Sequence, residues 1–429
     1  MKSSLVTPAA SLSQTARPMR RKEGENALQE GPVRIVLIGS SFKSSRLPER
    51  ERIGARLSRS SEVLKALPGV TEYAELITCN RIELVFATRS PEDTEFAFFS
   101  IFSGASPDWF YVRRDVEAIA HLFKVAAGLD SMVLGEDQIL SQVRGAGISA
   151  RTAGTSKGVL SSLFDAAGSV GAKAREPLES QGGARSVSEF ALRFALEKLG
   201  KRPRKVLLIG SGKTIRLAAL ELKDDATIYL ATKRRKLPFS RAILVSRSKM
   251  VGVAKSCDLI ISATKHSGYL IKNGSLNTGK LRVILDLAFP RNIDPALNQK
   301  STAVYNLDDL AVSAAALPRS PGADRADEFV LSEAERFSQW LLASRLSSAL
   351  SNLHQWAEEV RREETGAALR RMPGLTARQR MVVEVMSRRL VSKLMASPTR
   401  FAKSSTPELP QEERLKVIHR VFDRGEKRS

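Results

Sequence analysis

The chain has little cysteine and little histidine for its length. Its 429 residues include two cysteines and four histidines. They are Cys79, Cys257, His121, His266, His354 and His419. Two cysteines cannot make a disulfide framework, and so few of them is typical of a protein from a reducing compartment. No group of Cys and His has the spacing of zinc ligands, so we expect no metal site.

Long hydrophobic runs are also missing. No apolar stretch approaches the roughly 18 residues that a membrane-spanning helix needs. A hydrophobic fraction of 42% beside 27% charged residues is typical of a soluble globular protein. The first residues contain no long hydrophobic region, which argues against a secretory signal. We therefore expect no membrane insertion and a cytoplasmic location.

Acidic residues are absent before Glu23. The residues that precede it are rich in Ser, Thr, Ala and Arg. This composition is typical of an organelle transit peptide, of a disordered basic tail, or of a start codon assigned too early. We expect residues 1–32 to be an extension outside the folded domains. If that extension is a transit peptide, the location would be a plastid.

Basic residues outnumber acidic ones over the whole chain. Lys and Arg together number 68 against 46 Asp and Glu, which leaves a formal net charge of +22. Such a surplus creates a positive field that attracts polyanions. Nucleic acid is the first candidate and a membrane surface the second, while the alternative is a charge that serves solubility alone.

The first folded region, residues 33–180, mixes strand and helix signals. Val33–Gly39 predicts a strand and Glu49–Leu67 a helix, and two further strand-like pieces follow at Glu75–Asn80 and Ile82–Ala87. From Val116 to about Ala174, apolar residues recur at helical spacing. The order indicates an α+β domain.

The second region, residues 181–306, alternates strands with helices. A helix is expected at Val187–Leu199, followed by a strand at Lys205–Gly210 and a helix to about Leu222. Further strands are expected at 227–231, 242–245, 259–262 and 283–287. Such alternation predicts a parallel, Rossmann-like α/β sheet.

The third region, residues 307–429, reads as helical. Glu328 to Met372 is nearly free of proline and rich in Ala, Leu, Glu and Arg, which favours one long helix. A second helix is expected from Thr376 to Met395, apolar on one face and basic on the other. Because extended amphipathic helices need a partner surface, we expect dimerisation here.

Cys79 is the first candidate for chemistry. It follows a strand and stands two residues before Arg81, and a neighbouring cation lowers the pKa of a thiol and makes it nucleophilic. The alternative is a buried structural cysteine, which is the commoner role of a single Cys. We also interpret Cys257, at a strand start, as structural.

Several motifs resemble those of the glutamyl-tRNA reductases. Leu76–Leu84 (LITCNRIEL) is similar to the active-site strand of that family, and His121–Arg144 (HLFKVAAGLDSMVLGEDQILSQVR) is similar to its longest signature. Shorter resemblances follow at 257–264, 284–295, 305–310 and 394–399. The resemblance therefore extends from about Val33 to about Phe401.

The resemblance implies an activity. Cys79 would attack the glutamyl ester of charged tRNA, and NADPH would reduce the resulting thioester to glutamate-1-semialdehyde, the first step of tetrapyrrole (porphyrin) biosynthesis by the C5 route. His121 would be the second catalytic residue, orienting the ester or transferring a proton. Taken alone, His121 could equally be a core histidine.

The resemblance also implies a glutamyl pocket. Its members would be Thr78, Asn80, Arg81, Ser131, Glu136, Asp137, Gln138 and Gln142. A planar Arg81 fork suits the substrate carboxylate, and Glu136 suits its ammonium group. At Asp137 the chain departs from the family, which usually carries proline there.

A nucleotide site is expected where the first strand of the second region turns into a helix. Its residues would be Gly210, Ser211, Gly212, Lys213, Thr214 and Ile215, with Ile215 in place of the third glycine of G-x-G-x-x-G. The cations of Thr232–Lys236 favour the 2′-phosphate of NADP, and the alternative is a solvated basic loop.

The expected fold is thus α/β and α+β multidomain. A catalytic α+β domain and a Rossmann-like NADP-binding domain would be joined by a long spinal helix to a helical dimerisation domain, and the resemblance implies a V-shaped homodimer. Glutamyl-tRNA(Glu) would be the substrate and an aminomutase a partner. The rival functions are a shikimate-type dehydrogenase acting on a small molecule and a non-catalytic tRNA-binding paralogue.

Overall fold

The computed structural model describes residues 32–179, 186–232, 242–276, 282–299, 301–316 and 321–403, with residues 413, 414 and 417. These residues fall into two compact units, one from Pro32 to Ser347 and one that begins at Ser348. The long helix α12 (Pro321–Arg371) belongs to both units. Each unit is therefore described by itself.

The first sheet has the strand order β2-β3-β1-β4. Its strands are β1 (Arg34–Ser41), β2 (Val70–Ile77), β3 (Arg81–Thr88) and β4 (Tyr111–Arg114), and its pairs are antiparallel. Side chains of β1 alternate between two cores: Ile35 and Leu37 enter one, and Val36 and Ile38 enter the other. Since both faces of this sheet are buried, each needs a layer of helices.

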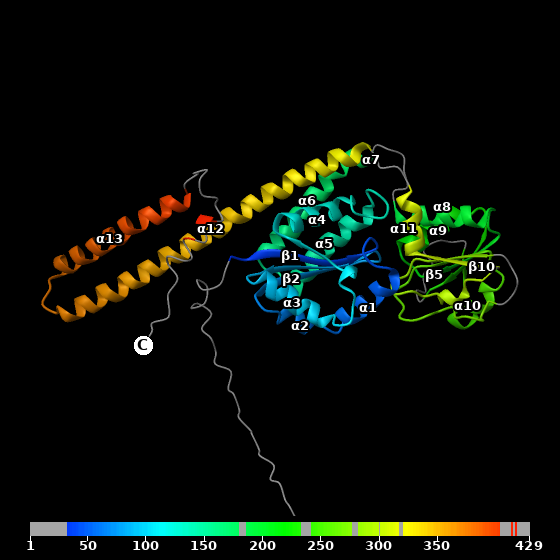
Figure 1. The fold of residues 1–429 in the computed structure, drawn as a ribbon, viewed down its shortest axis with the longest axis horizontal. Coiled ribbons are helices and arrows are strands. Elements are labelled where there is room, and N and C mark those ends of the chain that lie inside the picture. The colour runs from blue at the N-terminus through cyan, green and yellow to red at the C-terminus, as the bar shows by residue number, and fades with distance from the viewer. Residues whose placement is uncertain are drawn as a thin grey trace, which may run out of the picture. The chain divides into compact units, whose positions relative to one another are not determined.

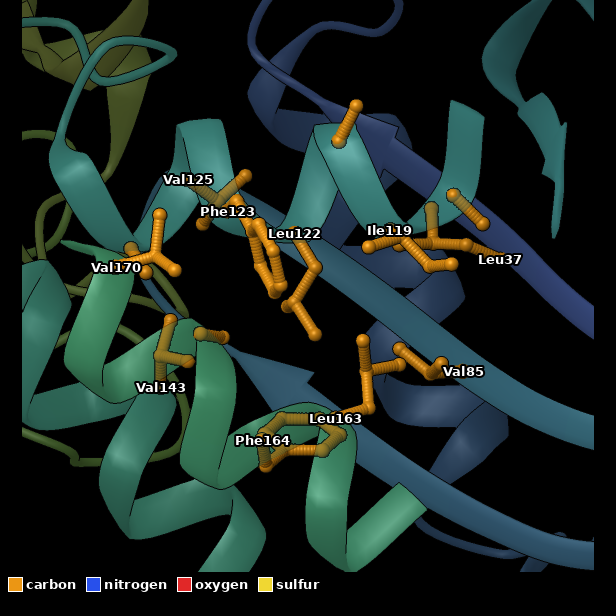
Figure 2. Packing of buried hydrophobic residues seen from close by; sticks show 14 of the residues in the cluster. Leu37, Val85, Ile119, Leu122, Phe123, Val125, Val143, Leu163, Phe164 and Val170 are labelled. Atoms are coloured by element: carbon orange, nitrogen blue, oxygen red, sulfur yellow. The ribbon is translucent and has the colours of Figure 1, made fainter. Parts of the chain in front are cut away.

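One face is covered by α4 (Asp115–Ala127), α5 (Asp137–Thr152) and α6 (Val159–Ala174), and the other by α1 (Leu47–Leu57), α2 (Ser61–Lys65) and α3 (Pro91–Ile101) (Figure 1). Figure 2 shows Leu37 and Val85 of the sheet facing Ile119, Leu122 and Leu163 of the first helical layer. A short α7 (Glu176–Glu179) follows α6. The expected α+β arrangement is confirmed.

The helix expected at Glu49–Leu67 is divided in the structure. α1 ends at Leu57 and α2 begins at Ser61. Between them, the hydroxyl of Ser58 donates to the carbonyl oxygen of Ala55, and that of Ser60 donates to the carbonyl oxygen of Arg56, both over 2.9 Å. Serine hydroxyls that bond nearby backbone in this way compete with helix continuation.

The second sheet has six parallel strands in the order β10-β9-β8-β5-β6-β7. They are β5 (Lys205–Ile209), β6 (Thr227–Ala231), β7 (Ile243–Leu244), β8 (Leu259–Ser262), β9 (Arg282–Asp286) and β10 (Thr302–Asn306). The chain winds outward from β5 to β7 and then returns to start again at β8 beside β5. This reversal is the topological switch point of a Rossmann fold, where dinucleotides bind.

Helices pack on both faces of this sheet. α8 (Val187–Leu199), α9 (Lys213–Leu222) and α11 (Leu307–Ala315) share one core, and α10 (Arg247–Ala254) covers the other face. α11 lies beyond the expected domain boundary at residue 306, yet its Leu310 and Ala314 are buried against the sheet. Apolar burial therefore keeps α11 with the nucleotide fold.

In the second unit, the later part of α12 packs against α13 (Ala377–Lys403). Leu353 and Ala357 of α12 bury Met395 of α13, and Nε2 of His354 lies 3.0 Å from Oγ1 of Thr399. α13 continues past Pro398, beyond the expected end at Met395. Proline removes one backbone hydrogen bond of the helix, and the helix nevertheless continues through Ala402, which is buried.

Much of α13 is not covered by the described residues of its own chain. Met381, Val382, Val385 and Leu390, the apolar face expected to need a partner, are all exposed. No described helix has the length and the apolar content required to cross a bilayer.

Candidate active site

Cys79 lies in a tight turn between β2 and β3. The backbone N–H of Thr78 donates to the carbonyl oxygen of Arg81 over 2.8 Å. The hydroxyl of Thr78 accepts hydrogen bonds from the backbone N–H groups of Asn80 and Arg81, over 3.2 and 3.1 Å. Thr78, Asn80 and Arg81 are buried, whereas Cys79 is partly exposed. The turn therefore holds Cys79 rigidly and gives the thiol access to a substrate.

The surroundings of Cys79 raise the pKa of its thiol to about 12. Burial is the largest cause, followed by the negative charge of Glu136, and together they outweigh the positive charges of Arg50 and Arg81. The expectation of a lowered pKa is therefore wrong for this structure.

Arg81 does not face the thiol with a free guanidinium, because carboxylates hold it. Its Nη1 donates to Oε1 of Glu83 over 2.9 Å and to Oδ2 of Asp130 over 3.0 Å, and its Nη2 donates to the backbone oxygen of Asp130 over 2.6 Å. Only 1% of its side chain is exposed. Its role as a fork for the substrate carboxylate stays a prediction. In that role Arg81 would have to give up a hydrogen bond to Asp130 or Glu83.

Glu83 is the centre of this cluster. Its Oε1 accepts hydrogen bonds from Arg81, from the hydroxyl of Tyr111 and from Nε2 of His121, the last over 2.7 Å. Burial alone would raise the pKa of Glu83, but the positive charges of Arg81 and His121 and the hydrogen bonds from His121 and Tyr111 lower it instead. Its Oε2 is buried without a hydrogen-bond partner in the described part of the chain. Glu83 is thus an ionised acceptor that orients His121.

Tyr111 and His121 reach Glu83 from different elements. Tyr111 begins β4, and a Cβ added to Gly39 of β1 would lie 2.7 Å from its ring. His121 lies on α4, with its ring 5.3 Å from that of Tyr111 between centroids. The absence of a side chain at Gly39 therefore makes room for the tyrosine that supports the carboxylate.

The loop from Gly128 to Glu136 supplies the remaining wall. Both of its glycines, Gly128 and Gly135, have positive φ, of 76° and 74°, and the N–H of Gly135 donates to the carbonyl oxygen of Gly128 over 3.0 Å. A Cβ at Gly128 would lie 2.9 Å from the backbone nitrogen of Glu136. The closed loop directs Asp130 to Arg81 and buries Glu136 at the start of α5.

Burial raises the pKa of Glu136 to about 7, although Arg81, Arg175 and Lys213 pull it down. The negative charge of Glu136 is in turn one of the causes that raise the pKa of the Cys79 thiol. Ser131 and Gln138 are half-buried beside this loop, whereas Asp137 and Gln142 are exposed on α5. The assignment of these residues to a glutamyl pocket stays a prediction.

Nothing in the sequence singled out Glu83, Tyr111, Asp130 or Lys43, whose Nζ pairs with Asp130. The position of Glu83 two residues after Arg81 in a strand was a usable signal, because such residues share a face. Tyr111 and Lys43 lie far from Cys79 in sequence, and no local pattern marks them.

The nucleotide turn follows β5. Gly210 has φ of 128°, and a Cβ there would lie 2.5 Å from the carbonyl oxygen of Ala263, just beyond β8. Gly212 is the N-cap of α9, and a Cβ added to it would meet no described atom within 4 Å. A close strand contact, an open helix start and the switch point together suit a dinucleotide diphosphate.

The other residues of this turn differ in their surroundings. Ser211 is half-buried and Lys213 is exposed, whereas Ile215 is fully buried in the core below the turn. The hydroxyl of Thr214 accepts a hydrogen bond from that of Ser188 over 2.9 Å. A role for Ile215 in cofactor binding would therefore be limited to its backbone. The basic run Lys233–Lys236 lies outside the described residues.

Three parts of the chain match known protein families. Residues 38–177 match the N-terminal domain of glutamyl-tRNAGlu reductase, 325–424 match its dimerisation domain, and 193–312 match shikimate / quinate 5-dehydrogenase. Glutamyl-tRNA reductase 2 of Anaeromyxobacter dehalogenans is 33% identical over 396 residues, which cover 87% of this chain and 89% of that protein.

The chain belongs to the glutamyl-tRNA reductase family.

Further relatives agree. Glutamyl-tRNA reductase of Geobacillus kaustophilus is 30% identical over 427 residues, 91% of this chain and 92% of that protein. The solved glutamyl-tRNA reductase from Methanopyrus kandleri has a TM-score of 0.50 at 23% identity and covers 90% of this chain and 98% of that chain. At this identity the likeness shows the fold alone, and it confirms the expected fold class.

Membership of the glutamyl-tRNA reductase family confirms the resemblance found in the motifs. It also separates this chain from a shikimate-type dehydrogenase, because that likeness is confined to residues 193–312. The dehydrogenase match and the Rossmann switch point together indicate a nicotinamide dinucleotide cofactor.

Proposed function

We propose that this protein reduces the glutamyl group of glutamyl-tRNA(Glu) to glutamate-1-semialdehyde with NADPH, through a thioester on Cys79. This is the first step of tetrapyrrole synthesis by the C5 route. The observation that carries the proposal is the accessible Cys79 turn, backed by the Glu83 cluster, in the same compact unit as a Rossmann switch point. Family membership supports the same reaction.

In the acylation step, the sulfur of Cys79 attacks the ester carbon of the glutamyl group. A C–S bond forms, the C–O bond to the tRNA ribose breaks, and the thiol proton ends on the departing ribose oxygen. The raised pKa of Cys79 would make this step slow if the surroundings stayed as they are. Binding of the substrate ammonium to Glu136 would cancel one of the charges that raise it, so the substrate itself activates the thiol.

We assign the proton transfer to His121. Because Glu83 is ionised and only accepts, Nε2 of His121 carries the hydrogen between them. In the ring form that carries this single hydrogen, Nδ1 is a proton acceptor. The Glu83–His121 pair can therefore take the thiol proton and pass it to the leaving oxygen.

The turn Gly210–Gly212, with Lys213 and Thr214, would hold the dinucleotide diphosphate through backbone N–H groups and the start of α9. A bound NADPH would supply the hydride for the thioester carbon; the C–S bond would then break and leave semialdehyde, NADP⁺ and the Cys79 thiolate. The choice of NADPH over NADH rests on the cations of 233–236, which would meet the 2′-phosphate.

The helical region would pair two chains and help to bind tRNA. The match to a dimerisation domain and the exposed apolar residues of α13 support a homodimer. The net charge of +22 suits a tRNA substrate, and binding should weaken steeply with salt. Because an amino aldehyde is reactive, we expect an aminomutase that consumes it to be a partner.

The test uses glutamyl-tRNA labelled in the glutamate, purified wild-type protein and the Cys79→Ser variant, with and without NADPH. Wild type should carry label without NADPH and release labelled semialdehyde with it, while Cys79→Ser should do neither, a loss of about 1,000-fold or more. Appreciable aldehyde from Cys79→Ser would reject the thioester. Folded wild type that binds tRNA but shows no label and no aldehyde would favour the non-catalytic paralogue.

A further inference from the structure

The start of α1 is capped by a residue of the second sheet's domain. Arg46, at the N-cap, makes no side-chain capping bond to a described residue, and Pro48 has no N–H. The backbone N–H of Leu47 donates instead to Oδ2 of Asp308 over 2.6 Å. Asp308 lies in the first turn of α11. Helix-start N–H groups are usually satisfied by a side chain of their own segment. Here the accepting side chain belongs to another domain, so the cap joins the two domains.

The same carboxylate also holds Arg50. Nη2 of Arg50 donates to Oδ1 of Asp308 over 2.7 Å, and none of the Arg50 side chain is exposed. A buried guanidinium left without an anion is strongly unfavourable, so this pair needs the second domain in place. The charge of Arg50 also acts on Cys79. The domain contact therefore holds a charge that lowers the pKa of the thiol.

The next residue of α1 makes a second ion pair with the opposite polarity. Glu51 accepts from the backbone N–H of Arg291 over 2.6 Å and from its Nη2 over 2.7 Å. On α1 the cation Arg50 is followed by the anion Glu51. Arg50 pairs with the anion Asp308, and Glu51 pairs with the cation Arg291. A shifted docking would set like charges together, so this pattern favours one register.

Apolar contact lies beside the two pairs. A Cβ added to Gly54 of α1 would lie 3.4 Å from Cδ1 of Ile82 and 3.5 Å from Cζ of Phe289. Ile82 follows Arg81 in β3, and Phe289 lies with Arg291 in the loop after β9. That loop leaves the carboxyl ends of the parallel strands, the edge at which a dinucleotide binds.

We propose that Arg50, Glu51, Arg291 and Asp308 form an interdomain clasp that positions the dinucleotide-binding edge of the second sheet against Cys79 for the reduction step. The inference rests on the proposed function and assigns Glu51 and Arg291 as positioning residues. The groups proposed to take part in acylation, Cys79, His121 and Glu136, all lie in the first domain, whereas reduction needs a donor from the second domain within reach of the thioester carbon. A misplacement of about 1 Å can cost about 100-fold in such a step.

The experiment reverses the more accessible pair. The variants are Arg291→Glu, Glu51→Arg and the double variant Glu51→Arg/Arg291→Glu, with Arg52→Glu as the matched control. Arg52 is exposed on the same helix, so it carries the same kind of charge change outside the clasp. Acylation is measured from label on the protein without NADPH, and reduction as a single turnover of the acylated protein after NADPH is added.

Each single variant should be acylated at close to the wild-type rate. Its reduction step should be at least about tenfold slower, because two like charges then face each other in a partly buried position. The double variant should recover most of the loss, and Arg52→Glu should show none. Equal losses in both half-reactions would overturn the clasp, as would a double variant no better than either single one.

A second readout uses the protein without nucleotide. Amide hydrogen exchange at the start of α1 and in the loop after β9 should speed up in both single variants and return towards wild type in the double variant. Unchanged exchange would show that the pair does not hold the domains together. If wild type itself neither acylates nor reduces, the proposed function fails, and the exchange result still decides the contact.

Discussion

The two halves of the candidate active site are built in opposite ways. Around Cys79, buried charged side chains hold one another: Glu83 takes hydrogen bonds from Arg81, Tyr111 and His121. At the nucleotide turn, side chains matter little, and the essential feature is a missing Cβ at Gly210 beside the backbone of Ala263. Substitutions around Cys79 should therefore act by unbalancing buried charges, and substitutions at the nucleotide turn should act by steric clash.

The difference also separates the chemistry of the two halves. A thiol that must attack an ester needs local control of protons and charge, which only ionisable groups supply. A diphosphate needs several N–H donors and close approach, which a glycine turn at a helix start supplies. The two needs explain why the Cys79 half is built from titratable side chains and the nucleotide turn from glycines.

The largest effect should come from Glu83→Gln. The change leaves the buried Arg81 with less negative charge and removes the ionised acceptor of His121, so we expect about 3–5 kcal/mol lower stability. Acylation should also fall about 100-fold or more. Urea unfolding and label uptake from glutamyl-tRNA would measure both. Tyr111→Phe, which keeps the ring and loses one bond to a charged group, should cost only about 1.5–3 kcal/mol.

The next effect should come from Gly210→Ala. The added methyl would collide with the carbonyl oxygen of Ala263 at a φ that disfavours alanine, so we expect a loss of about 2 kcal/mol or more and weaker NADPH binding. For stability, Gly212→Ala is the matched control, since its φ is −73° and its surroundings are open. Thermal unfolding would compare the two variants, and nucleotide titration would measure the binding by Gly210→Ala. Equal stability of the two variants would contradict the steric account of the turn.

A smaller effect should appear in the pH dependence. The pKa of Glu136 is raised to about 7, so its carboxylate is neutral below that pH and cannot bind the substrate ammonium. Acylation under kcat/KM conditions should rise through pH 7 and fall about tenfold per unit below it. Glu136→Gln should remove that limb. A wild-type profile that is flat from pH 6 to 8 would exclude Glu136 from this role.

The smallest effect should come from replacing Lys233, Arg234 and Arg235 together by glutamine. Without these cations the 2′-phosphate loses its attraction, and the preference for NADPH over NADH should narrow about tenfold or less. The ratio of the two kcat/KM values measures it. An unaltered ratio would show that these cations contact solvent and not the cofactor.

Much of the fold followed from local patterns. The helix Val187–Leu199 and the strands Thr227–Ala231 and Leu259–Ser262 lie where periodicity placed them. The single helix expected at Glu49–Leu67 was wrong, because Ser58 and Ser60 bond to backbone oxygens instead of letting the helix continue. α11 packs on the nucleotide core past residue 306, since its apolar residues match that surface.

Motifs alone pointed to the family, to Cys79 and to the glycine turn, because these depend on residue type and local spacing. The raised pKa of Cys79 and the carboxylates that hold Arg81 were decided by the tertiary structure, which packs the Cys79 turn among other elements and brings Glu83, Asp130 and His121 together from separate ones. The contact of α1 with Asp308 and Arg291 is of the same kind, since its partners lie at least 240 residues apart in the chain. A sequence states which charges exist, but only the folded chain decides which of them are neighbours and how little water lies between them.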